Sequence, residues 1–381
     1  MKIAIVCYPT FGGSGVVATE LGKALSRTKG HEVHFVTYSH PVRLEELSAN
    51  IHFHEVDVPQ YALFRYQPYE LALSSKLVEV IQKYQIELLH VHYAIPHAYA
   101  AYMARKMLED LGMSIPIVTT LHGTDITLVG KSQLYKPAVT FSINHSDAVT
   151  AVSNSLKEET FQLFNLNQTI EVIPNFIDIK KGLDHQIKCD RRMIESDVNK
   201  KIITHISNFR PLKRVIDVIK IFQKVKEQLS VKLLMVGDGP DRKKAYQYCK
   251  NRNLLNDVMF LGQSSEIQRI LCLSDLFLLP SESESFGLAA LEAMLYKVPV
   301  VSTNVGGLPE VNQHEFSGLT FPVGDIDGMA QGALAILSNP HNHKTYKDQA
   351  FENAKRFDVT HVIKAYEKVY QNVLMKVHQP A

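Results

Sequence analysis

The chain has 381 residues, of which 45% are apolar and 21% are charged, a composition typical of a folded globular protein long enough for two domains. Its formal net charge of +2 gives no reason to expect nucleic-acid binding or stable membrane association. No apolar run approaches the roughly 20 residues of a membrane span, and Met1-Lys2 leads into a predicted strand rather than a signal peptide, so we expect a cytoplasmic location. The four cysteines, Cys7, Cys189, Cys249 and Cys272, have no metal-ligand spacing, and three fall in or beside predicted elements, where we expect reduced, partly buried thiols.

The first predicted elements are a buried strand over Lys2–Cys7, a glycine-rich turn over Tyr8–Gly15 and a helix with an apolar face. A Rossmann-like domain begins with this order. The glycines do not follow G-x-G-x-x-G, and the next strand, His31–Tyr38, does not end in an acidic residue, so dinucleotide binding is not favoured. The turn is either a plain tight turn or a place where backbone amides approach an anionic ligand.

The strand-helix alternation continues through the first half of the chain. Strands are predicted over 50–56, 87–91, 115–121 and 147–152, and helices over 69–84 and up to 107. Because ligands of open α/β sheets bind at the carboxyl ends of the strands, the polar residues at these ends are candidates for one binding rim. They are Tyr93, Thr119, His122, Asp125 and Asn154.

A polar segment, 180–200, reads as an interdomain linker, and a second strand-helix domain begins at Lys201. The turn 208–214 carries Arg210 and Lys213, which either bind a diphosphate or form a solvated basic turn. Further strands are predicted over 231–236, 258–262 and 298–303, with 304–310 closing the sheet, and the last helices run from about 326 to 374.

The most informative stretch follows the apolar strand Asp275–Pro280. It is a short polar loop after which Gly287 opens a helix, and the free amides of a first helical turn can bind phosphate. Glu284 and Glu292 flank this turn, and their carboxylates can accept hydrogen bonds from the hydroxyls of a ribose or a sugar. Glu282 is better explained as part of a solvated acidic loop.

The E-x7-E spacing around Ser285-Phe286-Gly287-Leu288, with His122-Gly-Thr-Asp125 and Gly237-Asp-Gly-Pro240, resembles the retaining glycosyltransferases of family 4. The resemblance implies an α/β GT-B fold with two Rossmann-like domains whose parallel sheets face an interdomain cleft. Residues 1–178 would form the acceptor domain, with a C-terminal helix of about 360–381 packing back on it. Residues 179–359 would form the nucleotide-sugar donor domain.

The resemblance also implies the site residues. The catalytic set would be His122, Glu284, Lys213 and Arg210. The donor would contact Gly13, Asn208, Gly237, Gly239, Gly262, Ser285, Phe286, Gly287, Leu288 and Glu292. Asn208 stands where the family has arginine, and Arg210 is our candidate for the missing guanidinium. A lone histidine at a strand end, such as His122, is otherwise more often structural. No D-x-D motif occurs in a suitable loop, so we expect neither a metal nor another cofactor.

Five segments (7–15, 51–56, 92–98, 119–127 and 207–214) resemble one subfamily, which moves N-acetylglucosamine (GlcNAc) from UDP-GlcNAc to the hydroxyl of L-malate in the first step of bacillithiol synthesis. Malate would then be bound by Ser14, Arg65, Tyr93, Thr120 and Asn154. The alternatives are a different acceptor (inositol phosphate, a lipid or a glycan), an isomerase like the UDP-GlcNAc 2-epimerases, and a sugar-binding sensor without turnover. The two substrates are the expected partners, and a homo-oligomer is left open.

Overall fold

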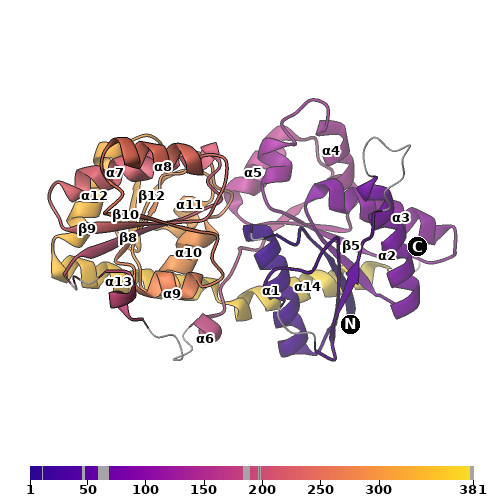
Figure 1. The fold of residues 1–381 in the computed structure, drawn as a ribbon. Helices are drawn as coiled ribbons and strands as arrows, with labels where there is room; N and C mark the ends of the chain where they lie inside the picture. Colours follow the sequence, from indigo (N-terminus) through magenta and orange to yellow (C-terminus); the bar gives the residue numbers. More distant parts are fainter. Residues whose placement is uncertain are drawn as a thin grey trace. The chain divides into compact units, whose positions relative to one another are not determined.

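A computed structural model describes residues 1–10, 12–44, 48–58, 68–182, 189–195, 197 and 199–377. The chain forms two compact units: unit 1 comprises Met1–Asn175 and the chain from Val359 on, and unit 2 comprises Phe176–Asp358 (Figure 1). The sequence placed these boundaries after residues 178 and 359. In the structure, unit 2 begins slightly before the predicted boundary, at Phe176. Ile177 belongs to unit 2 because it forms a parallel bridge with Asp358 and its N–H donates to the Phe357 carbonyl at 3.0 Å.

The described part of unit 1 contains a seven-stranded parallel sheet of order β3-β2-β1-β4-β5-β6-β7. Every strand is short, and the central strands are buried along their whole length, as expected where helices cover both faces of a sheet. Its strands are β1 (Lys2–Val6), β2 (Glu32–Thr37), β3 (Ile51–Glu55), β4 (Leu88–His92), β5 (Ile117–Leu121), β6 (Ala148–Ala151) and β7 (Ile170–Val172). Its helices are α1 (Gly13–Lys29), α2 (Tyr69–Tyr84), α3 (Tyr99–Glu109), α4 (Lys136–Asn144), α5 (Asn154–Leu163) and α14 (Val359–Val377), with helical turns at Ala94–Ala98 and Thr124–Leu128.

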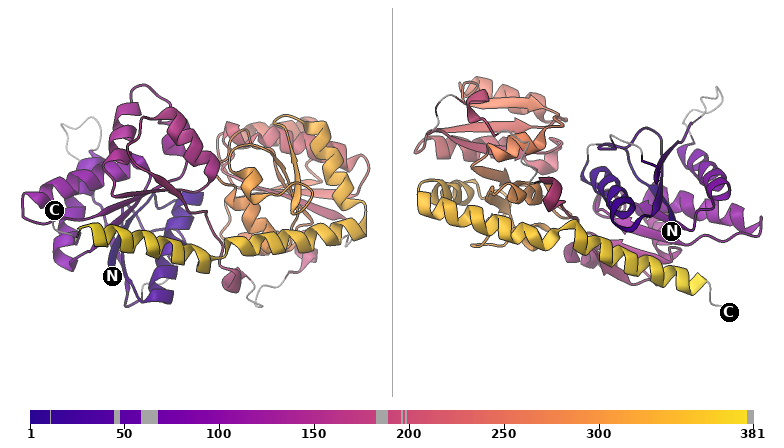
Figure 2. Two further views of the ribbon diagram at one scale, coloured as in Figure 1. Left: turned by 180° about the vertical axis from the view of Figure 1, so that it is seen from behind. Right: turned by 90° about the horizontal axis from the view of Figure 1, so that it is seen from below.

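Alternate residues of β4 show how the two faces of this sheet are covered. Leu89 and Val91 belong to the apolar cluster under α2 and α3. His90 lies between them and points to the other face, where its Nδ1 is 2.7 Å from the hydroxyl of Tyr370 on α14. Figure 2 shows α14, in yellow, lying along unit 1.

In the described residues of unit 2, a six-stranded parallel sheet has the order β10-β9-β8-β11-β12-β13. Its strands are β8 (Lys201–Ile206), β9 (Val231–Val236), β10 (Val258–Gly262), β11 (Leu276–Leu279), β12 (Val300–Thr303) and β13 (Gly318–Phe321). Its helices are α6 (Ile179–Gly182), α7 (Val215–Lys226), α8 (Arg242–Asn251), α9 (Ile267–Cys272), α10 (Leu288–Leu295), α11 (Leu308–Val311), α12 (Ile326–Leu337) and α13 (Pro340–Ala354), with helical turns at Arg191–Met193, Pro211–Lys213 and Lys355–Phe357.

The prediction that 298–310 closes this sheet was wrong. β13 pairs in parallel with β12 and forms the edge, while 304–310 is a turn that leads into α11. β13 has one buried and three half-buried residues, so it lacks the continuous apolar run that identified the other strands.

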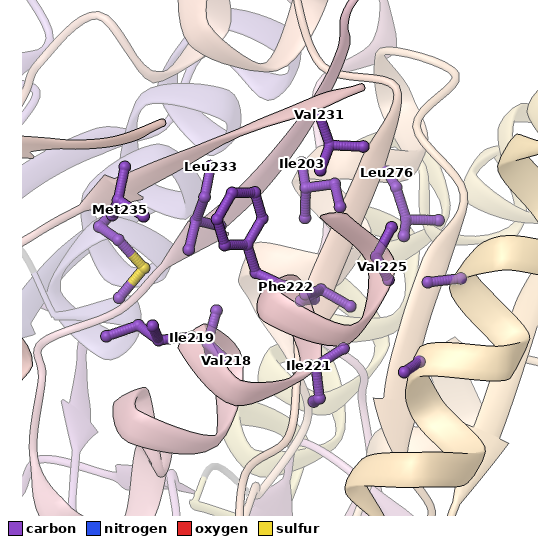
Figure 3. Packing of buried hydrophobic residues seen from close by; sticks show 14 of the residues in the cluster. Ile203, Val218, Ile219, Ile221, Phe222, Val225, Val231, Leu233, Met235 and Leu276 are labelled. Atoms are coloured by element: carbon purple, nitrogen blue, oxygen red, sulfur yellow. The ribbon is translucent and has the colours of Figure 1, made fainter. Parts of the chain in front are cut away.

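The core of unit 2 forms where α7 packs on the sheet. Figure 3 shows Phe222 and Val218 of α7 facing Leu233 of β9 and Ile203 of β8. All four side chains are fully buried. The helix is amphipathic, and burying its apolar stripe against alternate strand residues anchors the turn that precedes it. This turn, Pro211–Lys213, carries part of the candidate site.

The cysteines differ from expectation, because Cys189 and Cys272 form a disulfide. Cys7 and Cys249 are free and buried, and burial raises the pKa of the Cys7 thiol to about 12. Among the described helices, none combines the length and the apolar character needed to cross a bilayer.

Candidate active site

The loop after β11 is held rigidly at the carboxyl end of the unit 2 sheet. Thr303 donates its hydroxyl to the Ser281 carbonyl at 2.6 Å. The Glu284 carbonyl accepts from the Gly307 amide at 2.9 Å, and the Glu282 amide donates to the Leu212 carbonyl at 2.7 Å. The loop is therefore tied on one side to the turn after β12 and on the other to the turn after β8.

This anchoring brings Lys213 and Glu284 together. The Lys213 ammonium nitrogen is 2.5 Å from Oε1 of Glu284, and the Ser281 hydroxyl donates to the same oxygen at 2.9 Å. The side chains are only 16% and 12% exposed, so the pair is poorly screened by water. A cation and a carboxylate are thus fixed beside the N-terminus of α10, which begins after Gly287 at φ 99°.

The other predicted basic residue, Arg210, belongs to the same turn as Lys213. Arg210 is exposed, and its carbonyl accepts from the Lys213 amide at 2.8 Å, which closes the turn. The neighbouring Arg214 is committed to Asp217, with Nε 2.7 Å from Oδ2. Of these cations, Lys213 is the one that the structure sets against Glu284.

Gly237 and Gly239 follow β9 and pack against the protein's own backbone. A Cβ on Gly237 would lie 1.8 Å from the Ser207 carbonyl oxygen, and one on Gly239 would lie 2.0 Å from that of Asn208. The space that a side chain would need at both positions is therefore filled by the turn after β8. Asn208 itself is exposed, and the Gly262 carbonyl accepts from the Gly237 amide at 2.7 Å.

The remaining predicted donor residues lie around the start of α10. Phe286 is buried, with its ring centroid 5.6 Å from that of Phe357, so its side chain belongs to the core and only its backbone can face a ligand. Ser285, Leu288 and Glu292 are half-buried. Glu292 follows Leu288 by one helical turn and so shares its face of α10.

In unit 1, the structure brings Ser14 and Tyr93 together at the carboxyl end of the sheet. The Tyr93 hydroxyl donates to the Ser14 hydroxyl at 2.7 Å. Tyr93 follows β4 at φ 88°, and Ser14 lies in the first turn of α1, which begins at Gly13 rather than after Gly15 as expected. Gly13 is exposed and Ser14 is half-buried, so the start of α1 reaches the surface.

His122 lies beside this pair and is buried to 8% exposure. Its Nε2 is 2.7 Å from Nδ1 of His92, and its ring lies 5.2 Å from that of Tyr93, measured between centroids. Burial and the nearby His97 lower the pKa of His122 to about 3, so its imidazole is neutral at physiological pH. His92 was not among the predicted site residues, although its alternation with His90 in the strand Leu88–His92 was a visible signal.

Asp125 connects the turns after β4 and β5. Its carboxylate accepts from the Ala94 amide at 2.8 Å and from the Gly123 amide at 3.1 Å. Burial raises the pKa of Asp125 to about 6 despite these bonds. Asp125 therefore lies at the predicted rim, where its carboxylate holds the turns after β4 and β5 together.

Two threonines predicted at this rim are instead inside the fold. Thr120 is fully buried, with its Oγ1 2.8 Å from His90 Nε2 and 3.2 Å from the hydroxyl of Tyr366 on α14. The hydroxyl of Thr120 is therefore bonded within the fold, and its role as a malate ligand stays a prediction. Thr119 is also fully buried and bonds to Ser146 at 2.7 Å.

Of the last two predicted acceptor residues, Asn154 and Arg65, the structure describes only Asn154. Asn154 is exposed as the first residue of α5, whose N-cap is Ser153, with its side chain accepting from the Leu156 amide at 3.1 Å. Arg65 lies outside the described residues.

Comparisons with known proteins agree on one family. Residues 11–181 match the model of "Glycosyltransferase Family 4", and residues 186–356 match "Glycosyl transferases group 1". The N-acetyl-alpha-D-glucosaminyl L-malate synthase of Bacillus anthracis is 46% identical over 98% of this chain and 97% of its own length. The GPI3 subunit of the Saccharomyces cerevisiae phosphatidylinositol N-acetylglucosaminyltransferase is 24% identical over 98% of this chain and 83% of its own. The Anabaena protein HepE, crystallised with UDP and glucose, has a TM-score of 0.82 at 20% identity, covering 97% of this chain and 99% of that one.

Proposed function

The chain belongs to the family 4 glycosyltransferases, and we propose that it transfers GlcNAc from UDP-GlcNAc to the hydroxyl of L-malate, retaining the α configuration. Its two units with parallel sheets have the GT-B fold. The observation that carries the choice of acceptor is the 46% identity to the Bacillus anthracis synthase across nearly the whole chain. The reaction would be the first step of bacillithiol synthesis.

The donor is proposed to bind unit 2. Departure of the nucleoside diphosphate develops negative charge, and Lys213 supplies a cation where the amides of Gly287 and Leu288 open α10. Arg210 is exposed and able to reach a ligand from the same turn. Because these groups neutralise the diphosphate, we propose a transfer that needs neither a metal nor another cofactor.

The acceptor is proposed to bind unit 1. The hydrogen-bonded hydroxyls of Ser14 and Tyr93 and the free amides of the first turn of α1 offer donors to a dicarboxylate. Arg65, chosen from the sequence, would add the cation that two carboxylates require. Neutral His122 would contact the transferred sugar as a hydrogen-bond partner.

The proposed chemistry is a front-face displacement. The malate hydroxyl oxygen forms a bond to C1 of GlcNAc on the face from which the phosphate oxygen departs, and the departing β-phosphate of UDP takes the hydroxyl proton. Glu284 positions a sugar hydroxyl, while Ser281 fixes the carboxylate that it uses. Both proposed substrates are small, water-soluble metabolites, which supports a cytoplasmic location.

The test is a product assay with purified protein and UDP-GlcNAc, with and without L-malate, read by mass spectrometry. We expect UDP and GlcNAc-malate only when malate is present. The coupling constant of the anomeric proton, read from an NMR spectrum of the product, identifies the α configuration. Products with inositol phosphate, a lipid or a glycan in place of malate would assign another acceptor. Conversion of the donor at C2 without malate would indicate an isomerase.

A further inference from the structure

Three histidines gather on one face of the outer strands of the unit 1 sheet. His34 of β2 pairs in register with His52 of β3, and His54 follows two residues later on the same face. The ring centroids of His34 and His52 are 4.5 Å apart, and those of His34 and His54 are 5.1 Å apart. Glu32, two residues before His34, shares this face.

The ligand atoms of this cluster are spaced for one metal ion. Oε1 of Glu32 is 3.0 Å from Nε2 of His34 and 3.5 Å from Nε2 of His52. One ligand atom from each of the three residues lies within 4.8 Å of the others. Tetrahedral coordination with bonds of about 2.1 Å separates ligand atoms by roughly 3.4 Å, so small side-chain adjustments suffice.

We propose that Glu32, His34 and His52 bind one divalent transition-metal ion, Zn²⁺ by preference, with water as the fourth ligand. Two imidazoles and one carboxylate match the ligand preference of Zn²⁺ better than that of Mg²⁺ or Ca²⁺, which favour oxygen. The His34 side chain is fully buried, whereas those of His52 and Glu32 are 35% and 29% exposed, which gives the ion a path of entry and leaves room for water.

His54 completes the site by orienting a ligand. Its Nε2 is 2.8 Å from Nδ1 of His34, so Nδ1–H of His34 can donate to it and leave Nε2 of His34 free for the metal. The Tyr84 ring packs at 4.9 Å from that of His34 and 4.8 Å from that of His54, which restricts both. Metal sites commonly have such a supporting partner, and a chance cluster of surface histidines does not require one.

The nearby charges leave one carboxylate oxygen for the ion. Lys2 approaches Oε2 of Glu32 at 3.5 Å, whereas both histidine contacts are made by Oε1. The competing explanation is a metal-free network in which Glu32 accepts hydrogen bonds from its neighbours. The two explanations differ in whether the cluster binds added metal.

The site is distinct from the proposed catalytic residues. Glu32 and His52 lie in the first two residues of β2 and β3, at the amino-terminal edge of the parallel sheet. Tyr93 and His122 follow β4 and β5 at the opposite, carboxyl edge. Bound metal would therefore tie the outermost strand to β2 and take no part in sugar transfer.

The experiment uses the full chain without a polyhistidine tag, stripped with EDTA and desalted. Zn²⁺ is titrated in competition with a chromophoric chelator, and Co²⁺ replaces it for visible spectroscopy. We expect one equivalent of Zn²⁺ to bind, tetrahedral Co²⁺ absorption, and a melting temperature raised by roughly 5 °C at 100-fold excess over Kd. His52→Ala should weaken Zn²⁺ binding at least about 100-fold, and His54→Phe about 10- to 100-fold.

The matched control is His361→Ala, which removes an exposed histidine of the same unit and should leave Zn²⁺ affinity unchanged. Because His52 is partly exposed, circular dichroism and sugar-transfer activity of the His52→Ala protein should match the wild type, which shows that it is folded. No Zn²⁺ binding by wild type, or equal binding by wild type and His52→Ala, overturns the proposal. Zn²⁺ affinity, Co²⁺ absorption and melting temperature do not depend on which acceptor the protein uses. Failure of the metal proposal can therefore be told apart from failure of the proposed function.

Discussion

Lys213 and Glu284 reach each other from two different turns of unit 2 and form an ion pair with Nζ and Oε1 2.5 Å apart. Lys213 ends the turn after β8, and Glu284 lies in the loop after β11, the neighbouring strand of the sheet. Each side chain is more than four-fifths buried, so losing one partner leaves a poorly hydrated charge. The pair can therefore serve the fold, the reaction or both.

Substitution separates these roles. If Lys213 stabilises the departing diphosphate as proposed, Lys213→Ala should lower kcat on the order of 100-fold, because that cation is lost. It should also lower the melting temperature, because the Glu284 carboxylate loses its cation. The double variant Lys213→Ala/Glu284→Gln removes the unpaired charge, so it should regain stability but not activity. If the double variant recovers kcat as well, Lys213 has only a structural role.

Tyr93→Phe should raise the KM for malate about 10-fold and leave that for UDP-GlcNAc unchanged. The substitution removes the hydroxyl that donates to Ser14 and keeps the ring against His122. A lost hydrogen bond to a charged ligand is worth about 1.5 kcal/mol, which corresponds to roughly that factor. Steady-state kinetics with malate varied make the measurement, and Tyr99→Phe, at a partly exposed ring, is the control. An unchanged malate KM would exclude Tyr93 from the acceptor site.

Gly306→Ala should disrupt the loop that carries Glu284. The residue has φ 54°, and a Cβ there would lie 2.0 Å from the Glu284 carbonyl oxygen. We expect a loss of about 2 kcal/mol or more in the free energy of unfolding and a lower kcat/KM for the donor. Gly30→Ala is the control, because φ is 65° and nothing lies within 4 Å of the added carbon, so it carries backbone strain alone. Equal losses from both variants would show that the contact with Glu284 does not matter.

The elements that the sequence predicted best are those whose signal is local. Continuous apolar runs such as Leu276–Leu279 mark buried parallel strands, and the helix over Tyr69–Tyr84 has the predicted bounds. The short edge strand Gly318–Phe321 was missed because three of its residues are only half-buried, which weakens the apolar pattern.

What could not be predicted depends on residues far apart in the chain. Thr120 lies near the end of the expected strand, but its hydroxyl meets that of Tyr366 of α14, 246 residues later, inside the fold. The Lys213–Glu284 pair joins residues 71 apart, and the motifs predicted a separate role for each. Motifs identify candidate residues, whereas the packing decides which of them face one another.

The disulfide between Cys189 and Cys272 predicts a thiol count that differs between redox states. The denatured protein should show two reactive thiols without reductant, from Cys7 and Cys249, and four after reduction. Because the bond closes a loop of 83 residues, reduction should lower the free energy of unfolding by about 2–4 kcal/mol. Cys272→Ser should have the stability of the reduced wild type and no further response to reductant. Four reactive thiols in the untreated protein would contradict the bond.

The buried histidines of unit 1 should make the fold sensitive to acid. Burial lowers the pKa of His90 and His122 to about 3 and that of His97 to about 4. Between these values and the ordinary 6.5, the unfolded chain binds protons that the native protein does not, so stability falls as the pH falls. The limiting slope is about 1.4 kcal/mol per pH unit for each histidine. Asp125 acts in the opposite direction, because its raised pKa of about 6 makes the native state bind the extra proton.

Urea unfolding at pH 7, 6 and 5 measures this dependence, and a variant isolates one histidine. His97 donates its Nδ1–H to the His92 carbonyl at 2.5 Å, so His97→Asn can keep a donor there while removing the titrating ring. Its stability should fall less steeply with acid than that of wild type, by about 1.4 kcal/mol per pH unit near pH 5. His361→Ala, at an exposed position, should keep the wild-type slope. Parallel slopes for wild type and His97→Asn would mean that His97 is already protonated in the native protein.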